Sequence, residues 1–382
     1  MKMKGFVCLV LFSVVATYSV SALDFFAPTV VDVRSSGMGK SYLCDFDQPF
    51  VLVNNPSGMM FSGKQVFLPT LAFDLGLPPK APSIIFDMVK SNGNTDIVNT
   101  LVELLKGSNG IYMDGDIMLP LTFSVVANNW GIGLYNNVFV RADLPSVSSM
   151  TVMAGGDLFL VGGFSCPIID EGIHKVSLGI TAELLGRFGI YHQGSVTGLT
   201  SIDFSTLPAF MTLGMGFDIG ATYNVWDFLS VSAVWKDLYI GMDKNLGTIS
   251  SMSFSENGDW EKFLQSGDLT LGVGVQVPTG VLKKVLSSFA VYVDYANITK
   301  LFNREKAVFL PHPLLDLSVG MEAVLFKSIA LRFGMTGPYL SGGLGVDLGP
   351  FHMSMALYGK EKGLDPGTSP QVHGAFSLAF YY

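Results

Sequence analysis

Apolar and polar residues alternate strictly along many segments of the chain. From Met211 to Tyr223 every odd position is apolar, and every even position is threonine, glycine or aspartate. The same period of two recurs at 269–277, at 315–325 and in the last residues. This period is that of a β-strand with one apolar and one polar face.

The strand template fits about fourteen segments, most of them about 9–14 residues long. They lie near 66–76, 117–127, 130–142, 151–164, 174–190, 209–223, 227–240, 269–277, 288–296, 314–326, 328–336, 340–348, 351–359 and 372–382. About 9–11 tilted residues cross a bilayer as a strand, and bacterial outer-membrane barrels have an even strand count. The pattern therefore predicts an all-β fold, a transmembrane antiparallel β-barrel of about 14 strands whose apolar faces meet lipid.

The composition supports this prediction. Only 14% of the residues are charged and 49% are hydrophobic, with 43 glycines and a net charge of −8, whereas about 25% charged residues are typical of soluble domains. These values exclude a disordered chain and a nucleic-acid-binding protein. A soluble β-sandwich or propeller is the alternative with the same alternation. The strand lengths, the scarcity of Lys and Arg, and the aromatic end at Phe380–Tyr382 favour the barrel.

The first residues have the features of a cleaved signal peptide. Lys2 and Lys4 form a basic start, Phe6–Val15 is apolar, and Val20–Ala22 offers the small residues of a cleavage site. We expect cleavage after Ala22, with a retained membrane anchor as the alternative. The prediction is export to the bacterial outer membrane, where an assembly machinery inserts the barrel.

Two kinds of segment do not fit the strand pattern. Residues 23–65 are apolar and irregular, and we expect them to fill the barrel as an N-terminal plug (hatch), leaving 66–382 as the barrel. Helical excursions are predicted near 83–107, where Leu101 and Leu105 share a helical spacing, and near 246–267. The first helix either caps the mouth, contacts lipid, binds a ligand or packs over the rim.

A search for catalytic and metal motifs predicts no enzyme, no cofactor and no metal site. The five histidines show no paired spacing, and no nucleophile elbow occurs. The segment Gly37–Ser41 resembles the end of a phosphate-binding loop, but Arg34 occupies the place of its first glycine. Whether Cys44 and Cys166 form a disulfide is left open.

The polar faces of the strands place charged residues in the lumen. Arg332 is a rare inward cation of the type that binds carboxylates; its alternative role is a structural pair with an acid on a neighbouring strand. The charges either hold the plug or line a path for a polar headgroup. The inward set is Glu183, Asp218, Asp294, Asp316, Glu322, Arg332 and Asp347.

Several short motifs, in their order, resemble the FadL family of outer-membrane transporters. Ser35–Tyr42 is similar to the glycine-rich opening of that family, and Asn55–Gly58 to its Asn-Pro-Ala-Gly-like plug motif. The tail, through Leu331–Gly334, Gly342–Gly349 and Tyr358–Glu361, resembles a spirochaete branch of FadL-like barrels. The chain departs from the family in its Ser in place of Ala at the plug motif and in its proline-rich insertion at 77–82.

The resemblance implies passive, ligand-gated transport of long-chain fatty acids or other hydrophobic small molecules, with sideways exit through the barrel wall. It implies an apolar pocket with one or two headgroup partners, and the candidates for these partners or for ion pairs are Arg332, Asp316, Glu322 and Asp347. A monomer in contact with outer-membrane lipid is expected. The plug or gating motif would consist of Gly37, Gly39, Asn55, Pro56, Ser57 and Gly58.

Two other functions are compatible with the same barrel. One is a structural or secretion-associated barrel that binds an envelope protein and transports nothing. The other is a general diffusion porin for polar solutes, which would conduct ions freely.

Overall fold

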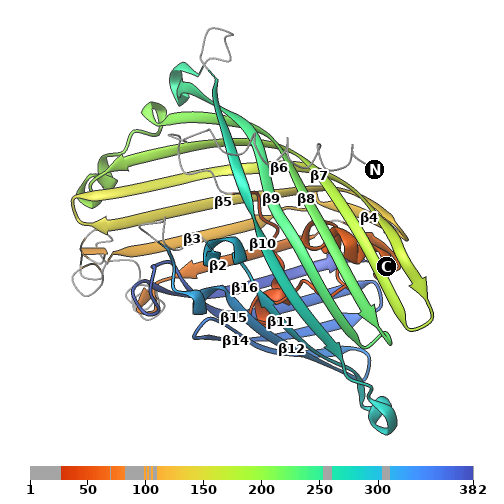
Figure 1. Ribbon diagram of the computed structural model, residues 1–382. Helices are drawn as coiled ribbons and strands as arrows, with labels where there is room; N and C mark the ends of the chain where they lie inside the picture. Colours follow the sequence, from red (N-terminus) through yellow and green to blue (C-terminus); the bar gives the residue numbers. More distant parts are fainter. Residues whose placement is uncertain are drawn as a thin grey trace.

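A computed structural model describes residues 27–381 apart from 69, 82–98, 100, 103–104, 106–109, 253–259 and 303–309. The predicted signal peptide at 1–22 lies outside these residues. The described part is mainly one antiparallel sheet that curls into a barrel (Figure 1). No helix among the described residues is long and apolar enough to cross a membrane.

The barrel has fourteen antiparallel strands and is closed, which confirms the predicted fold class. Its order is β2–β3–β5, then β6 through β16 in sequence, and β16 pairs again with β2. Two short strands complete the wall: β1 pairs with β4, and β4 with β5. Because β5 pairs with both β3 and β4, these two form one wall strand interrupted at 119–122. Strands β1 and β2 are interrupted in the same way at 68–70.

The strands differ in length around the barrel. The first two wall strands are the interrupted ones. One consists of β1 (Lys64–Phe67) and β2 (Leu71–Leu77), and the other of β3 (Ile111–Met118) and β4 (Phe123–Ala127). The long-stranded half has 16 to 23 residues per strand: β5 (Trp130–Ser146), β6 (Ser149–Glu171), β7 (His174–Gly194), β8 (Pro208–Val225), β9 (Leu229–Thr248) and β10 (Glu261–Gln276). The short-stranded half has 8 to 11: β11 (Leu286–Tyr295), β12 (Leu317–Leu325), β13 (Ile329–Thr336), β14 (Tyr339–Leu348), β15 (Phe351–Glu361) and β16 (Pro370–Phe380).

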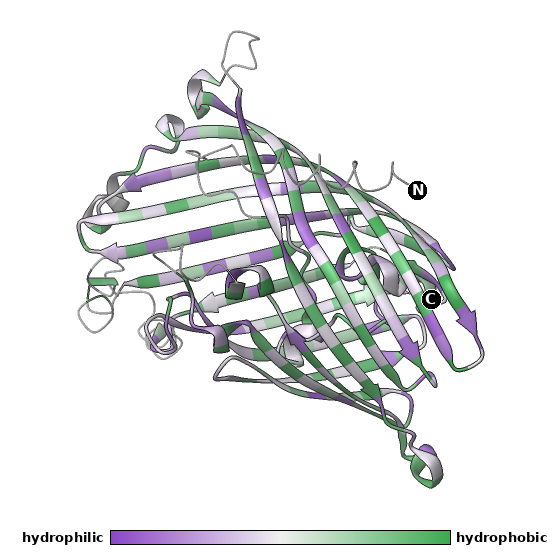
Figure 2. Cartoon of the chain, in the orientation of Figure 1, coloured by the Kyte–Doolittle hydropathy of each residue, from purple (hydrophilic) through white to green (hydrophobic). Residues whose placement is uncertain are grey.

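The alternation read from the sequence matches the two faces of the wall. In β8, Asp218 is 2% exposed and its neighbour Ile219 is 56% exposed, because successive side chains point to opposite faces. The colouring by hydropathy alternates along the long strands in the same way (Figure 2). The apolar residues are therefore outside and the small or polar residues inside, as a barrel in lipid requires.

The two ends of the barrel differ. Short connections such as 128–129, 172–173 and 349–350 lie at one end, here called the turn end, together with the last described residue. Longer connections such as 195–207 and 296–316 lie at the other, the loop end. They contain η2 (Val196–Ser201), η3 (Phe204–Thr206), η4 (Ile249–Ser251), α6 (Ile298–Phe302) and η6 (Pro313–Asp316), whereas η5 (Gly280–Lys284) lies at the turn end.

Some predicted boundaries are wrong. Residues 253–259 of the helical excursion expected near 246–267 lie outside the described residues. The described part of this range is mostly strand, since β9 continues to Thr248 and β10 begins at Glu261, and the rest contains the single turn η4. The second predicted strand begins at Ile111 instead of 117. In β3 the alternation is interrupted by Tyr112 and Gly115, and at the start of β10 polar residues stand at both parities.

Most of the excursion near 83–107 lies outside the described residues. Leu101, Val102 and Leu105 are helical and pack with Ile111 and Leu144. The last two belong to the outward faces of β3 and β5, because the alternate residues of these strands face the lumen. The described helical residues thus pack against the outward faces of β3 and β5 near the loop end.

Residues 27–62, the inner segment, cross the lumen. The segment contains α2 (Val33–Gly37), α3 (Val51–Asn54) and η1 (Pro56–Met60). The Asp32 side chain caps α2 by accepting from the Ser35 amide, and Pro56 starts η1, where its missing N–H costs nothing. Val51, Leu52 and Met59 are fully buried against inward residues of the wall such as Phe159.

The interruption of the first wall strands is closed by one side chain. The Asn136 amide nitrogen donates to the carbonyl of Leu119 (3.0 Å) and to the hydroxyl of Thr122 (2.9 Å), and its oxygen accepts from the Leu119 amide (2.8 Å). Asn136 thereby replaces ladder bonds that the break removes. Leu119, Leu121 and Phe123 are exposed on the outside here.

Candidate functional site

Asn55 holds the inner segment against the long-stranded half; with its partners it is called the Asn55 anchor. Its side-chain oxygen accepts from the amides of Ser57 (3.1 Å) and Gly58 (3.2 Å). Its nitrogen, with two hydrogens to donate, lies 2.8 Å from the Leu43 carbonyl and 3.2 Å from each of the hydroxyls of Thr222 on β8 and Ser232 on β9. All the polar groups of this side chain are therefore used, and no charge is involved.

The Ser57 hydroxyl extends the Asn55 anchor. It lies 2.7 Å from the Thr222 hydroxyl, and the Ser57 carbonyl accepts from Ser177 on β7 at 2.6 Å. The serine that departs from the family motif thus adds a hydroxyl contact to Thr222 of the wall, which alanine would lack.

Inward glycines of the wall form the surface on which the inner segment lies, here called the glycine seat. A Cβ on Gly179 would lie 2.3 Å from the Pro56 backbone, and a Cβ on Gly334 would lie 2.3 Å from the Met38 backbone. Both contacts are with backbone atoms, which cannot move aside as the end of a flexible side chain could. The seat consists of Gly131, Gly163, Gly179, Gly220, Gly272, Gly274, Gly320, Gly334 and Gly343. The close approach of the inner segment thus explains the glycines at these inward positions of the wall.

Gly37 and Gly39 press against the short-stranded half. A Cβ on Gly37 would meet the Gly343 backbone at 3.1 Å, and Gly39, at a φ of +65°, would meet Met335 at 2.4 Å. The carbonyl of Gly39 accepts from the Thr336 hydroxyl at 2.6 Å. The six residues of the predicted gating motif therefore all lie at contacts between the inner segment and the wall or within its own turns.

Four charged residues form the Arg34 anchor on the short-stranded half. Arg34 donates to Glu322 on β12 at 2.8 Å and to Asp45 at 3.1 Å. Glu322 also accepts from Arg332 on β13 at 2.6 Å. Burial raises the pKa of the Asp45 carboxyl to about 7, and Arg34 opposes this shift. Arg332 is therefore occupied by an acid on the neighbouring strand, the alternative that the sequence left open.

The other two candidate residues lie elsewhere. The Asp347 carboxylate lies 2.7 Å from Nδ1 of the His352 ring near the turn end. Asp316 accepts from the Asn297 amide at 2.6 Å at the loop end. The structure thus brings Arg332 and Glu322 together but gives Asp347 and Asp316 their own partners. The four form no common headgroup site.

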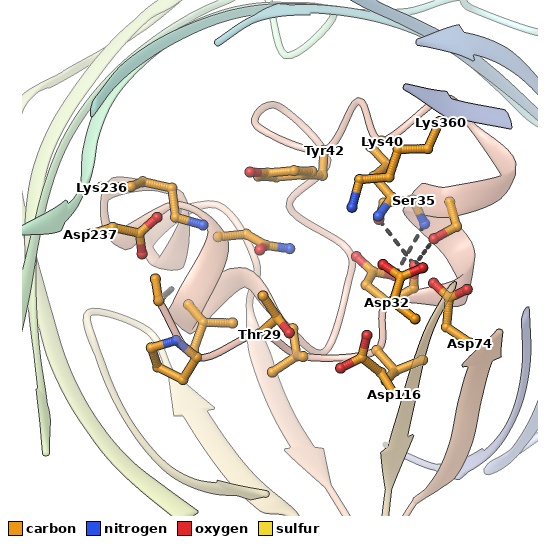
Figure 3. A pocket seen from close by; sticks show the side chains of 18 of the residues that line it. Thr29, Asp32, Ser35, Lys40, Tyr42, Asp74, Asp116, Lys236, Asp237 and Lys360 are labelled. Carbon is orange, nitrogen blue, oxygen red and sulfur yellow. Dashed lines mark hydrogen bonds between the residues drawn. The ribbon is translucent and has the colours of Figure 1, made fainter. Parts of the chain in front are cut away.

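A cavity of about 520 Å³ lies between the inner segment and the wall (Figure 3). Ala27, Pro28, Val30 and Val53 of the inner segment, with Phe159, make it partly apolar. Charged side chains of both signs make up much of the remainder, which differs from the apolar pocket expected. They are Asp32, Lys40, Asp74, Asp114, Asp116, Arg141, Glu183, Lys236, Asp237, Lys360 and Lys362.

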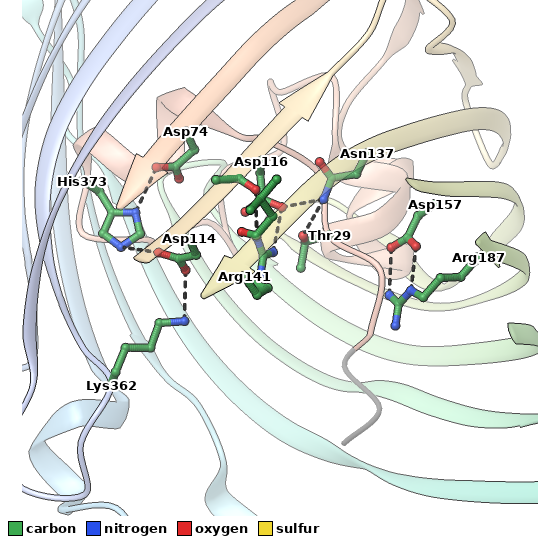
Figure 4. Close-up of polar contacts among 12 residues, drawn as sticks. Thr29, Asp74, Asp114, Asp116, Asn137, Arg141, Asp157, Arg187, Lys362 and His373 are labelled. Carbon is green, nitrogen blue, oxygen red and sulfur yellow. Dashed lines mark hydrogen bonds and ion pairs between the residues drawn. The ribbon is translucent and has the colours of Figure 1, made fainter. Parts of the chain in front are cut away.

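Ion pairs fix several of these side chains to the wall (Figure 4). His373 on β16 lies 3.0 Å from Asp74 on β2 and 3.6 Å from Asp114 on β3, and Asp114 also accepts from Lys362 at 3.0 Å. Beyond them Arg141 pairs with Asp116 at 2.7 Å. The pairs join β16 to β2 and β3, the connection after β15 to β3, and β3 to β5, so they tie the wall together beside the interruption.

Three lysines that line the cavity form no ion pair with an acid of the described residues. No ion pair within 4.0 Å joins Lys40, Lys236 or Lys360 to a carboxylate of the described residues. Lys40, at a φ of +59°, follows the turn after α2 and lies over the Tyr358 ring. Lys236 lies over the Tyr42 ring, beside a bulge at Asp237. Figure 3 shows Lys40 and Lys360 together on one side of the cavity and Lys236 on the other.

Sequence reasoning missed these lysines for different reasons. Lys360 shares the inward parity of Ala356 and Tyr358, so the alternation of β15 could have found it. Lys40 belongs to no regular pattern. Lys236 lies where the register of β8 and β9 shifts, and a bulge is not readable from a period of two.

The described residues form neither a metal-binding group nor a disulfide. Among the described residues no three His, Cys, Asp or Glu side chains form a metal-binding group. Cys44 and Cys166 are both free thiols. Burial raises the pKa of the Cys44 thiol to about 12, so this thiol is unreactive at neutral pH while the inner segment is in place.

Comparison with known proteins gives only structural likenesses. No protein-family model and no curated protein matches the chain. The toluene transporter TodX of Pseudomonas putida is 13% identical, covers 92% of this chain and 97% of its own, and gives a TM-score of 0.48. A FadL homologue of Pseudomonas aeruginosa is 11% identical, covers 94% of this chain and 99% of its own, and gives a TM-score of 0.47. The Ralstonia pickettii toluene transporter TbuX is 12% identical, covers 91% of this chain and 97% of its own, and gives a TM-score of 0.45.

At these identities and TM-scores the likenesses carry no conclusion about the function of this chain. The chain's own residues establish a closed barrel of fourteen strands, with an N-terminal segment bonded to its inward faces. This is the architecture that the sequence pattern predicted. The fold of the described residues is thus a closed, fourteen-stranded antiparallel barrel whose lumen holds the inner segment.

Proposed function

We propose that the protein is an outer-membrane transporter for long-chain fatty acids or other hydrophobic small molecules, gated passively by movement of the inner segment as a plug. One observation carries this proposal. The cavity is lined by residues 27–32 of the inner segment itself, so a ligand that enters it touches the chain that fills the barrel. Ligand binding and displacement of the plug are then linked through the same contacts.

The cavity suits an amphiphile. Its volume of about 520 Å³ is within the range of about 300–1,000 Å³ that is usual for small-molecule sites. Ala27, Val30 and Phe159 offer apolar contact for a hydrocarbon chain, and Lys40 and Lys360 offer cations to a carboxylate. A carboxylate head is the group that such lysines bind best.

The interruption of the wall at 68–70 and 119–122 is the proposed exit. Asp74, Asp114 and Asp116 place β2 and β3 beside the cavity, and exposed leucines surround the break outside. An apolar molecule that leaves here enters lipid without crossing water, which is the more favourable path.

The remaining features of the proposal follow from the barrel. The turn end would face the periplasm, since outer-membrane barrels have their short turns there, and residues 1–22 would direct export. The protein would be a monomer inserted by the outer-membrane assembly machinery, with no enzymatic activity. An open porin is disfavoured by the bonded inner segment. A barrel that only binds an envelope protein would have no use for unpaired lysines in its cavity.

Binding of a labelled long-chain fatty acid to the refolded full chain tests this function. We expect saturable binding, weakened about tenfold by Lys360→Gln because a charged hydrogen bond is lost. The uncharged methyl ester of the same acid should bind equally to both forms. Lys262→Gln, an exposed lysine of β10, is the matched control. Failure of the wild type to bind either ligand would contradict the proposal.

A further inference from the structure

Two connections at the turn end form one exposed surface that is both apolar and basic. One is η5 with Val285, between β10 and β11; the other joins β12 to β13 at Phe326 and Lys327. Val281 is 99% exposed, and Leu282, Val285 and Phe326 are at least half exposed. The surface, here called the rim patch, consists of Val281, Leu282, Lys283, Lys284, Val285, Phe326 and Lys327. Figure 1 shows the β10–β11 connection projecting from the barrel.

The rim patch is held in one shape. The Phe326 amide donates to the Val285 carbonyl at 2.9 Å, and the Lys327 amide donates to the Ser287 hydroxyl at 2.8 Å. Phe326 and Lys327 both have positive φ, 52° and 61°, which makes this a tight turn. The two connections therefore present their side chains together.

The charge of the rim patch is opposite to that of the whole chain. The chain carries a net charge of −8 with 23 lysines and arginines, yet residues 277–288 and 325–329 contain three lysines and no acid. No ion pair within 4.0 Å joins Lys283, Lys284 or Lys327 to a carboxylate of the part that the structure describes. Three ammonium groups in this place are thus available to an anion.

The position of the rim patch indicates which kind of anion it binds. The patch follows directly on lipid-facing strands, so its apolar side chains reach the level where acyl chains meet headgroups. Lysines at this level extend their charged ends toward phosphates. Basic clusters beside a membrane-spanning element attract anionic lipids. A soluble acidic protein would match the lysines but would leave Val281 and Leu282 without an apolar partner.

We propose that the rim patch binds an anionic phospholipid of the adjacent leaflet, with the phosphate on Lys283, Lys284 and Lys327 and an acyl chain along Val281, Leu282 and Phe326. This site lies at the turn end and outside the barrel, so it is independent of whatever the cavity transports. Binding there would orient and retain the barrel in a leaflet that contains phosphatidylglycerol.

Lipid retention by the purified full chain tests the site. The protein is loaded in detergent with equal amounts of dioleoyl phosphatidylglycerol and dioleoyl phosphatidylcholine, and the retained lipids are counted by native mass spectrometry. We expect preferential retention of phosphatidylglycerol. Combined Lys283→Gln, Lys284→Gln and Lys327→Gln should reduce that preference at least tenfold, since each lysine contributes about fivefold. The corresponding triple arginine variant should keep it.

Two results would overturn the site. One is a wild type that retains both lipids equally. The other is a glutamine variant, folded by circular dichroism, with unchanged preference for phosphatidylglycerol. Val281→Ser with Leu282→Ser should reduce the retention of both lipids, and unchanged retention would exclude the acyl-chain contact.

Discussion

The inner segment is attached to the two halves of the barrel by different chemistry. On the long-stranded half the Asn55 anchor uses neutral amide, hydroxyl and backbone groups. On the short-stranded half the Arg34 anchor balances two arginines against two acids. Neutral bonds depend on geometry and hardly respond to pH or salt, whereas a charged cluster depends on its protonation and on every member. The comparison suggests a fixed attachment at Asn55 and an adjustable one at Arg34.

Disturbing the glycine seat beneath the Asn55 anchor should have the largest effect. Gly179→Leu places side-chain atoms where the Pro56 backbone lies, so we expect the inner segment to be displaced. In a Cys166→Ser background, maleimide labelling of Cys44 at neutral pH should change from almost none to complete. Gly186→Leu, on the outward face of the same strand with nothing nearer than 3.9 Å to its Cβ, is the control. Equal labelling in both variants would show that the seat does not hold the segment.

Removing one acid from the Arg34 anchor should have the next largest effect. Glu322→Gln leaves two arginines with Asp45 alone, and breaking such a buried cluster costs about 3–5 kcal/mol. The free energy of unfolding in urea with detergent measures this loss. Glu322→Gln combined with Arg332→Met leaves Arg34 with Asp45 and should cost less than the single change. A larger cost for the double variant would contradict the balanced cluster.

Removing the central side chain of the Asn55 anchor should cost somewhat less. Asn55→Ala leaves the amides of Ser57 and Gly58 without an acceptor, and we expect a loss of about 2–3 kcal/mol. The neighbouring Asn54→Ala is the matched control, because Asn54 donates only one long bond, of 3.4 Å, to Gln48. Equal losses in the two urea titrations would mean that burial alone, and not the bonds of Asn55, stabilises this region.

The pH dependence should be the smallest effect and should separate the two anchors. The pKa of Asp45 is raised to about 7 by burial, so its protonated form favours the folded state. This contribution is complete below the unfolded pKa near 3.8 and is lost as the pH rises through about 7. Urea stability between pH 5 and 8.5 should therefore fall in the wild type but not in Asp45→Asn. A parallel fall in both would assign the dependence to another group.

The sequence was sufficient for the barrel because a period of two is local and repeats in every strand. It was also sufficient for the inward position of Glu322 and Arg332, whose parity is clear. It did not reveal that Arg34 and Asp45 join Glu322 and Arg332 in one cluster. Arg34 and Glu322 are 288 residues apart in sequence, and such distant partners leave no local pattern. The apolar pocket was implied by the family resemblance, whereas the charge of the cavity comes from residues of this chain such as Lys40 in a turn and Lys236 at a bulge.

The central claim is that the inner segment closes the barrel, and ion conductance of the full chain in planar bilayers tests it most directly. The account predicts that the wild type shows almost no conductance steps and that Gly179→Leu shows large, porin-like steps. A wild type that already conducts like an open porin, or a Gly179→Leu variant as closed as the wild type, would contradict the claim.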